Sequence, residues 1–217
     1  MNWEPFDGGW RLAPAGGAAQ AAVVLLHGVG SNAQDLLPLA ETWRDALPHV
    51  AFVSLDGSEP FDGGFGGRQW FSLRDISESN REERVLAASV VFRRRLDAEL
   101  AHWGLGYDAL ALVGFSQGSI MSLYHVATQP EGAAAVIAYA GRLAAQVVAK
   151  SRAVLTLVHG EDDDVIPVQE LERAAIAFSD AGYAVTAYAL PGVGHTITPQ
   201  GVMLGREALV RAFGSRG

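Results

Sequence analysis

Six short, continuous apolar runs recur along the chain, separated by longer segments in which apolar and polar positions mix. The runs are rich in Val, Leu, Ile and Ala, and runs of this length predict strands that are buried on both faces. They cover residues 21–27, 50–55, 109–115, 133–140, 153–159 and 184–190. Residues 10–14 are a further candidate, for a strand at the edge of the same sheet.

The segments between the runs carry apolar residues at helical spacing. Val85, Phe92, Leu96 and Leu100 mark one face of a helix over about residues 81–103. A second helix is predicted around residues 171–178, and a last one is entered at Pro199. Alternating strands and helices predict an α/β fold with a mostly parallel, twisted sheet and helices on both faces. Because the chain shows no linker or repeat, we expect one domain over residues 1–217.

Composition narrows the class of protein. A chain of 217 residues with 49% hydrophobic residues buries roughly 70% of its unfolded surface and needs no metal or disulfide to fold. The net charge of −8 argues against a nucleic-acid binder. No cysteine is present, which excludes disulfides, cysteine metal sites and a cysteine nucleophile. No apolar run is long enough to span a bilayer, so we expect a cytoplasmic protein without stable membrane insertion.

The five residues Gly-Phe-Ser-Gln-Gly at 114–118 are the strongest functional signal. They follow an apolar run and precede a helical segment, which is the context of the nucleophile elbow of α/β-hydrolases, with Ser116 as nucleophile. With 25 glycines in the chain, a chance glycine-rich turn with a serine N-cap explains the five letters equally well. The assignment of Ser116 as a nucleophile therefore depends on a base, an acid and an oxyanion hole that other parts of the chain must supply.

A serine nucleophile needs a base, and six histidines are available. His195 alone follows the last predicted strand, as the chain order nucleophile, acid, histidine requires, although a surface loop would also place a histidine there. His27 and His159 end predicted strands and are interpreted as half-buried, hydrogen-bonded residues. No histidine has partners at the spacing of metal ligands, so we expect no metal.

The acid and the oxyanion hole belong to two further loops. Four consecutive carboxylates at residues 161–164 follow the run at 153–159, and their pattern does not decide which one orients the histidine. The backbone N–H of Gln117 and that of Val29, in a glycine-rich loop after the first buried run, are the candidate oxyanion donors. A phosphate-binding loop is the alternative at Val29, but the Gly-Lys of a P-loop is missing.

Taken together, these motifs make the chain similar to the phospholipase/carboxylesterase family of α/β-hydrolases, which includes acyl-protein thioesterases. The matching stretches are Leu-Leu-His-Gly-Val-Gly at 25–30, Arg-Gln-Trp-Phe at 68–71, Gly-Phe-Ser-Gln-Gly at 114–118, His-Gly-Glu-Asp-Asp-Asp-Val-Ile-Pro at 159–167 and Gly-His at 194–195. The resemblance implies an α/β-hydrolase fold without a lid domain or a cofactor. It also implies that Asp163 is the acid of a Ser116–Asp163–His195 triad. Ser119 departs from the family, which commonly has glycine there.

The expected function is that of a serine carboxylesterase acting on small esters or thioesters with short to medium acyl chains. Residues expected to line the acyl pocket are Phe65, Trp70, Phe71, Ile166 and Ile197. For Trp70 and Phe71, packing in the core is the alternative. The glycine-rich loop at 56–72 is expected to overhang the serine, and aromatic residues near Trp70 could also form a homodimer surface. A lysophospholipase or acyl-protein thioesterase is the alternative, and a non-catalytic hydrolase-like binding protein is a third hypothesis.

Overall fold

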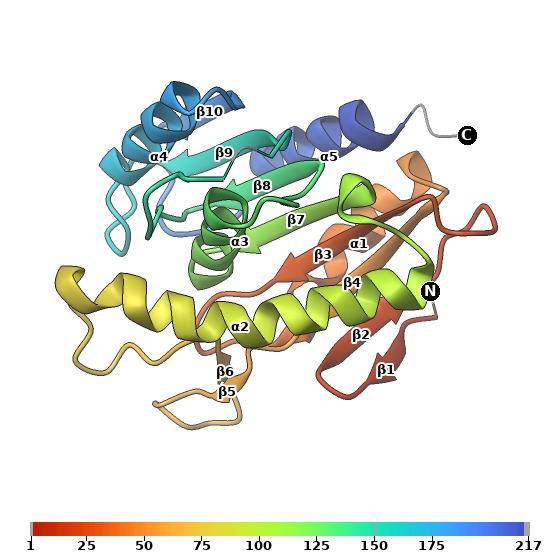
Figure 1. Cartoon of the computed structure of the whole chain (residues 1–217), viewed down its shortest axis with the longest axis horizontal. Coiled ribbons are helices and arrows are strands. Elements are labelled where there is room, and N and C mark those ends of the chain that lie inside the picture. The colour runs from red at the N-terminus through yellow and green to blue at the C-terminus, as the bar shows by residue number, and fades with distance from the viewer. Residues whose placement is uncertain (1, 150, 215–217) are drawn as a thin grey trace.

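The six predicted apolar runs form strands of an eight-stranded sheet with the order β1-β2-β4-β3-β7-β8-β9-β10 (Figure 1). The computed structural model describes residues 2–149 and 151–214. Neighbouring strands from β4 to β10 pair in parallel, whereas β1–β2 and β2–β4 are antiparallel. The strands are β1 (Glu4–Phe6), β2 (Gly9–Leu12), β3 (Ala21–Leu26), β4 (Val50–Leu55), β7 (Leu110–Phe115), β8 (Ala135–Tyr139), β9 (Val154–Gly160) and β10 (Ala184–Leu190). The prediction of a mostly parallel α/β sheet is confirmed.

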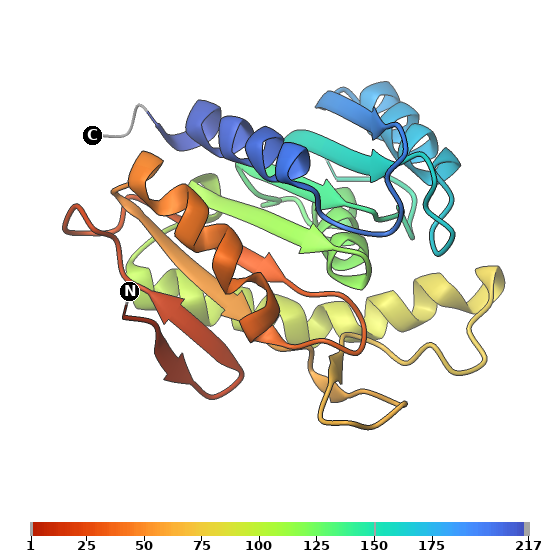
Figure 2. The ribbon, with the colours of Figure 1, turned by 180° about the vertical axis from the view of Figure 1, so that it is seen from behind.

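Helices cover both faces of this sheet (Figures 1 and 2). α2 (Glu78–Trp103), α3 (Gln117–Thr128) and α4 (Gln169–Asp180) pack on one face. α1 (Leu37–Trp43) and α5 (Pro199–Phe213) pack on the other. Short 3-10 helices cover Ala33–Leu36, Arg44–Ala46 and Tyr107–Ala109. Apolar side chains from both faces of the central strands build the two halves of the core, so these strands carry no exposed face.

Parallel pairing brings three loops to one edge of the sheet. Leu26 at the end of β3 pairs with Gly114 of β7, and Phe115 pairs with Tyr139 at the end of β8. Tyr139 in turn pairs with Val158, two residues before the end of β9. The segments that follow β3, β7 and β9 therefore start side by side, as ligand-binding loops of open α/β sheets do.

Three details differ from the sequence-based expectation. β10 was expected to be buried, but it is the last strand of the sheet and most of its residues are exposed or half-exposed, because only one neighbour pairs with it. Residues 9–12 do not form the sheet edge, since β1 pairs outside them in a hairpin. The loop at 56–72 contains a small antiparallel ladder of β5 (Glu59–Pro60) and β6 (Arg68–Gln69).

His125 of α3 is buried between aromatic rings. Its imidazole stacks on Tyr107 at a centroid distance of 5.6 Å and meets Phe92 edge to face at 5.9 Å. Its Nε2–H donates to the carbonyl oxygen of Gly132 at 3.0 Å. Burial lowers the pKa of His125 to about 4, so the folded protein keeps this side chain neutral.

We expect acid to destabilise the fold through His125. Because its folded pKa lies below the ordinary value, protons bind preferentially to the unfolded chain as pH falls from about 6.5 to 4. The free energy of unfolding should fall by about 3 kcal/mol over this window, from this residue alone. Urea denaturation at several pH values gives the free energy of unfolding as a function of pH. This free energy should change less steeply with pH for His125→Gln than for the natural protein. The exposed His102→Gln variant is the control, and an equal slope in all three proteins would contradict the assignment.

In the described part of the chain, no helix has the length and apolar character needed to cross a membrane.

Candidate active site

Ser116 stands in the turn between β7 and α3 in a strained backbone conformation, with φ 53° and ψ −115°. Two glycines permit the close approach around it. A Cβ on Gly114 would lie 2.4 Å from the backbone of Gly118, and a Cβ on Gly118 would lie 2.0 Å from the carbonyl oxygen of Leu26. The N–H of Ser116 donates to the carbonyl of Tyr139 at 2.9 Å, which ties the turn to β8. The predicted elbow is therefore a strand-to-helix turn with an upright serine.

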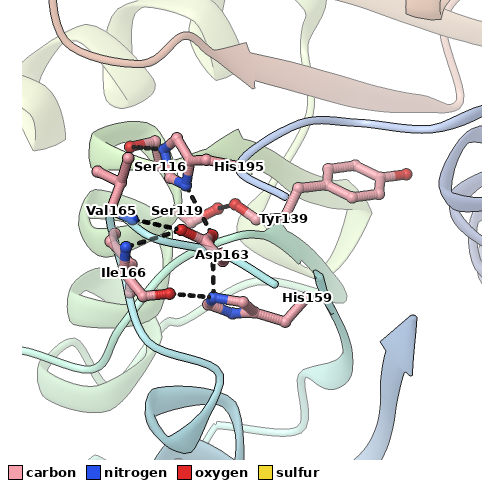
Figure 3. Close-up of polar contacts among 8 residues, drawn as sticks. All are labelled: Ser116, Ser119, Tyr139, His159, Asp163, Val165, Ile166 and His195. Atoms are coloured by element: carbon pink, nitrogen blue, oxygen red, sulfur yellow. Dashed lines mark hydrogen bonds and ion pairs between the residues drawn. The ribbon is translucent and has the colours of Figure 1, made fainter. Parts of the chain in front are cut away.

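Ser119, where the family commonly has glycine, reinforces the same turn. Its hydroxyl lies 2.7 Å from the carbonyl oxygen of Gly114 and 2.7 Å from that of Tyr139 (Figure 3). Opposite it, Gly141 leaves room for the side chain, since a Cβ there would lie 2.3 Å from the Cβ of Ser119. The departure from the family is thus accommodated by a small residue on the neighbouring segment.

Three side chains from three loops meet beyond the carboxyl ends of the parallel strands (Figure 3). The Nε2 atom of His195 lies 2.9 Å from the Oγ of Ser116, and its Nδ1 lies 2.7 Å from the Oδ2 of Asp163. Asp163 lies between β9 and α4, and His195 lies between β10 and α5. A carboxylate only accepts hydrogen bonds, so the Nδ1 of His195 carries the proton and its Nε2 accepts from the serine hydroxyl.

Asp163 is held as a carboxylate by the donors around it. Its Oδ1 accepts hydrogen bonds from the backbone N–H groups of Val165 and Ile166 at 2.9 and 2.8 Å. Burial opposes ionisation, but the bonds from His195, Ile166 and Val165 outweigh it and lower the pKa of Asp163 below its ordinary value. The group is therefore ionised at neutral pH and faces the imidazole as an anion.

The four consecutive carboxylates at residues 161–164 differ in how exposed their side chains are. The side chain of Asp163 is buried, while Glu161, Asp162 and Asp164 are exposed. The backbone N–H of Asp162 donates to the carbonyl of Val193 at 2.9 Å, which joins this loop to the segment that carries His195. The residue that the family pattern selects is thus the one whose carboxylate meets His195.

The loop after β3 packs directly against the elbow. A Cβ on Gly28 would lie 3.4 Å from the Cβ of Ser116 and 3.1 Å from the ring of Phe115, so only glycine fits without displacing them. Within the described residues, the backbone N–H groups of Val29 and Gln117 have no acceptor. These are the two amides that the sequence singled out, and both remain available to a ligand oxygen.

A buried histidine sets the direction of one of these amides. The Nδ1–H of His27 donates to the carbonyl oxygen of Gly28 at 2.6 Å, and its Nε2 accepts from the N–H of Gly57 at 2.8 Å. Burial lowers the pKa of His27, which favours this neutral form. In a trans peptide the C=O and the following N–H point in opposite directions, so the bond to Gly28 also orients the N–H of Val29.

The segment at 57–71 is hydrogen-bonded both to the loop that follows β3 and to Gln117 of the elbow. The indole N–H of Trp70 donates to the carbonyl of His27 at 2.9 Å. The side chain of Gln117 accepts from the N–H of Trp70 at 2.8 Å and donates to the carbonyl of Phe71 at 2.7 Å. Gln117 therefore has two roles at the site. Its backbone N–H lies next to the nucleophile, and its side chain fixes the backbone of Trp70 and Phe71.

The five residues expected in the acyl pocket have different positions. Trp70 and Phe71 are 1% and 2% exposed and belong to the core, because their backbone is tied to Gln117. Ile166 is buried beside Asp163, and Ile197 is half-buried next to α5. Phe65 is fully exposed at a loop tip. Of these five residues, Ile166 is the one whose backbone N–H is hydrogen-bonded to a triad residue, at the carboxylate of Asp163.

His159 is the residue at this site whose role the sequence reasoning did not identify. It was interpreted as half-buried, whereas its side chain is 1% exposed and contacts the Oδ2 of Asp163 at 3.2 Å. Its position four residues before Asp163 was the available signal. Elsewhere in the described ranges, no group of three acidic or histidine side chains is arranged to hold a metal ion.

Comparisons with known proteins bear on the family and the fold of the chain. The family model described as Phospholipase/Carboxylesterase matches residues 10–209. The chain is 37% identical over 180 residues to "Esterase YpfH" of Escherichia coli (strain K12), covering 82% of this chain and 77% of the relative. It is 28% identical over 163 residues to "Acyl-protein thioesterase 1" of Schizosaccharomyces pombe, covering 69% and 71%. The structure of esterase PE8 superposes with a TM-score of 0.89 and 34% identity over 94% of this chain and 98% of that one.

Proposed function

The chain belongs to the phospholipase/carboxylesterase family of α/β-hydrolases, and from this we propose that it hydrolyses carboxylic esters by two-step acyl transfer at Ser116. It is a serine hydrolase that acts on esters. The observation that carries the proposed mechanism is the unbroken line of hydrogen bonds from Ser116 Oγ through His195 to Asp163.

In the first step the Nε2 of His195 takes the proton of the Ser116 hydroxyl while Oγ attacks the ester carbonyl carbon. The carbonyl oxygen becomes an anion and accepts hydrogen bonds from the N–H groups of Val29 and Gln117. The imidazolium then gives its proton to the leaving alcohol, whose C–O bond breaks, and the acyl group stays on Ser116.

In the second step a water molecule takes the place of the alcohol. His195 removes a proton from the water, the hydroxide attacks the acyl-enzyme, and the proton returns to Ser116 as the acid leaves. Asp163 remains ionised throughout, keeps the proton of the resting imidazole on Nδ1 and stabilises the imidazolium that forms twice in each cycle.

Short to medium acyl chains fit this site better than long ones. A long acyl groove near residues 63–73 would expose Trp70 and Phe71, yet both side chains are packed in the core. The buried ring of Trp70 also meets Phe92 of α2 edge to face at 5.6 Å, so it cannot move without opening the layer between sheet and helix. An acyl-protein thioesterase activity is the second candidate, because curated relatives carry that name.

A chain-length series tests the substrate class. We expect kcat/KM to be highest for p-nitrophenyl acetate to octanoate and to fall for the palmitate, because the space beneath the 57–71 segment is filled. Acyl thioesters of the same chains, assayed by thiol release, form the parallel series, and the Ser116→Ala variant supplies the background. A preference for palmitoyl esters or thioesters would favour the second candidate instead.

A further inference from the structure

A second imidazole reaches the carboxylate of Asp163 from the side opposite His195. His159 is the last but one residue of β9, and its side chain is 1% exposed. Its Nε2 atom lies 3.2 Å from the Oδ2 of Asp163 and 2.7 Å from the carbonyl oxygen of Ile166 (Figure 3). The acyl-transfer mechanism above makes no use of this residue.

The two acceptors determine where the proton of His159 lies. A carboxylate oxygen and a peptide carbonyl oxygen both only accept, so Nε2 carries a hydrogen. It donates this hydrogen to the carbonyl oxygen of Ile166, while the Oδ2 of Asp163 lies 3.2 Å from the same nitrogen. Because the N–H of Ile166 also donates to the Oδ1 of Asp163 at 2.8 Å, two hydrogen bonds and the 3.2 Å contact join the three residues in a ring. The carboxylate thus receives hydrogen bonds from Val165, Ile166 and His195, and its Oδ2 also contacts the Nε2 of His159.

We propose that His159 is a positioning residue for Asp163, and that its Nε2–H holds Oδ2 in line with the Nδ1–H of His195. The inference rests on the proposed function, in which Asp163 is the acid of the triad. Without His159, Oδ2 would keep the hydrogen bond from His195 but lose the polar contact on its other side, and the two groups would be free to shift together. With it, the carboxylate is anchored to β9, the same rigid strand from which its loop departs.

The surroundings of His159 leave it no other partner of this kind. The side chains around a small void beside it are apolar: Leu123, Ala138, Leu157, Leu171 and Ala174. In the described part of the chain, Asp163 is the one ionisable side chain within hydrogen-bonding distance of it. The other carboxylates of the loop, at 161, 162 and 164, are exposed to solvent and screened. His159 therefore acts through Asp163 and does not touch the substrate.

Three substitutions of His159 distinguish a role for its N–H group from a role in filling space. The amide nitrogen of His159→Gln reaches as far along the side chain as Nε2, that of His159→Asn stops one bond short, and His159→Leu offers none. For Leu and Asn we expect kcat to fall by about tenfold to hundredfold, with KM within about twofold. For Gln we expect kcat within about threefold of the natural enzyme. Rates are counted per active site by titrating Ser116 with a fluorophosphonate, which corrects for unfolded protein.

The pH profile gives a readout that lost packing would not change. Removing the polar N–H group that lies 3.2 Å from Oδ2 leaves more of the charge of Asp163 to interact with His195, so the imidazolium of the variant should persist to higher pH. The acid limb of kcat/KM should move to higher pH for Leu and Asn and stay in place for Gln. A damaged core would instead lower the rate equally at all pH values.

A measurement on the unmodified enzyme covers the case in which a variant does not fold. Nitrogen NMR of histidine-labelled protein should show His159 protonated on Nε2 and His195 protonated on Nδ1, two opposite tautomers on one carboxylate. A bare Nε2 on His159 would overturn the proposal. So would unchanged kcat and pH profile for Leu and Asn, or a Gln variant as impaired as Leu.

Failure of this inference is distinguishable from failure of the proposed function. If Asp163→Asn is inactive while the His159 variants behave like the natural enzyme, only the positioning role is wrong. If Asp163→Asn retains full activity, the acid itself is misassigned, whatever the His159 variants do.

Discussion

Replacing Ser116 with alanine should lower kcat for p-nitrophenyl butyrate by about 10⁴- to 10⁶-fold while the protein stays folded. The hydroxyl is the nucleophile, so its removal leaves only binding and the oxyanion donors to assist water. The strained backbone at φ 53° should tolerate the change, because serine already places a Cβ there and alanine adds no atom. Steady-state kinetics and a thermal melt of the same preparation check both halves of the expectation.

Ser122 provides the matched control for this substitution. It lies on α3, the helix that follows Ser116, is fully buried, and donates its hydroxyl to the carbonyl of Gly118 at 2.9 Å. Ser122→Ala should keep kcat within about threefold and lose some stability, since a buried hydrogen bond contributes about 1 kcal/mol. A fluorophosphonate should label the natural protein and Ser122→Ala but not Ser116→Ala. Retained esterase activity in Ser116→Ala, or absence of labelling in the folded natural protein, would contradict the proposed chemistry.

Asp163→Asn should lower kcat by about 10³- to 10⁴-fold. The amide group has one oxygen and one NH₂, whereas both carboxylate oxygens of Asp163 face N–H donors. Because two N–H groups, those of Val165 and Ile166, donate to the Oδ1 position, the amide oxygen is favoured there and the NH₂ turns toward the ring of His195. The histidine then loses the acceptor that keeps its proton on Nδ1, so its Nε2 is no longer free to accept from Ser116. Kinetics at neutral pH, with circular dichroism as a check on folding, measure the effect.

The neighbouring carboxylates make this test specific. Asp162→Asn and Asp164→Asn change the same charge by the same amount one residue away, on side chains that are exposed. Both should keep kcat within about twofold, since exposed charges are screened by solvent. If either of these two variants lost activity as severely as Asp163→Asn, the loop would matter as a charged unit and the assignment of one acid would fall.

Local patterns carried much of this site. The close backbone approaches around Ser116 require glycine at 114 and 118. Five consecutive residues therefore predict the elbow, provided that a strand precedes them and a helix follows. The chain order placed His195 after the last strand. The acid was different, because four adjacent carboxylates have the same local pattern and only the family resemblance pointed to Asp163.

The pocket residues show where such reasoning ends. Trp70 and Phe71 have the composition of an acyl pocket wall, but their exposure depends on what lies against them. The side chain of Gln117, 46 and 47 residues away, binds their backbone and holds them in the core. The full exposure of Phe65 has the opposite cause, since its loop turns away between glycines with positive φ.

By itself, the sequence determined the α/β order of elements, the elbow around Ser116 and the choice of His195, because these depend on hydrophobic period, backbone sterics and chain order. Only the tertiary structure decided that Asp163 is the buried carboxylate of its loop, that β10 is an exposed edge, and that His159 shares the aspartate with His195. The physical reason is that burial and hydrogen-bond partners are set by residues distant in sequence. Ser116 and His195 are 79 positions apart, and no local pattern encodes the 2.9 Å between their reacting atoms.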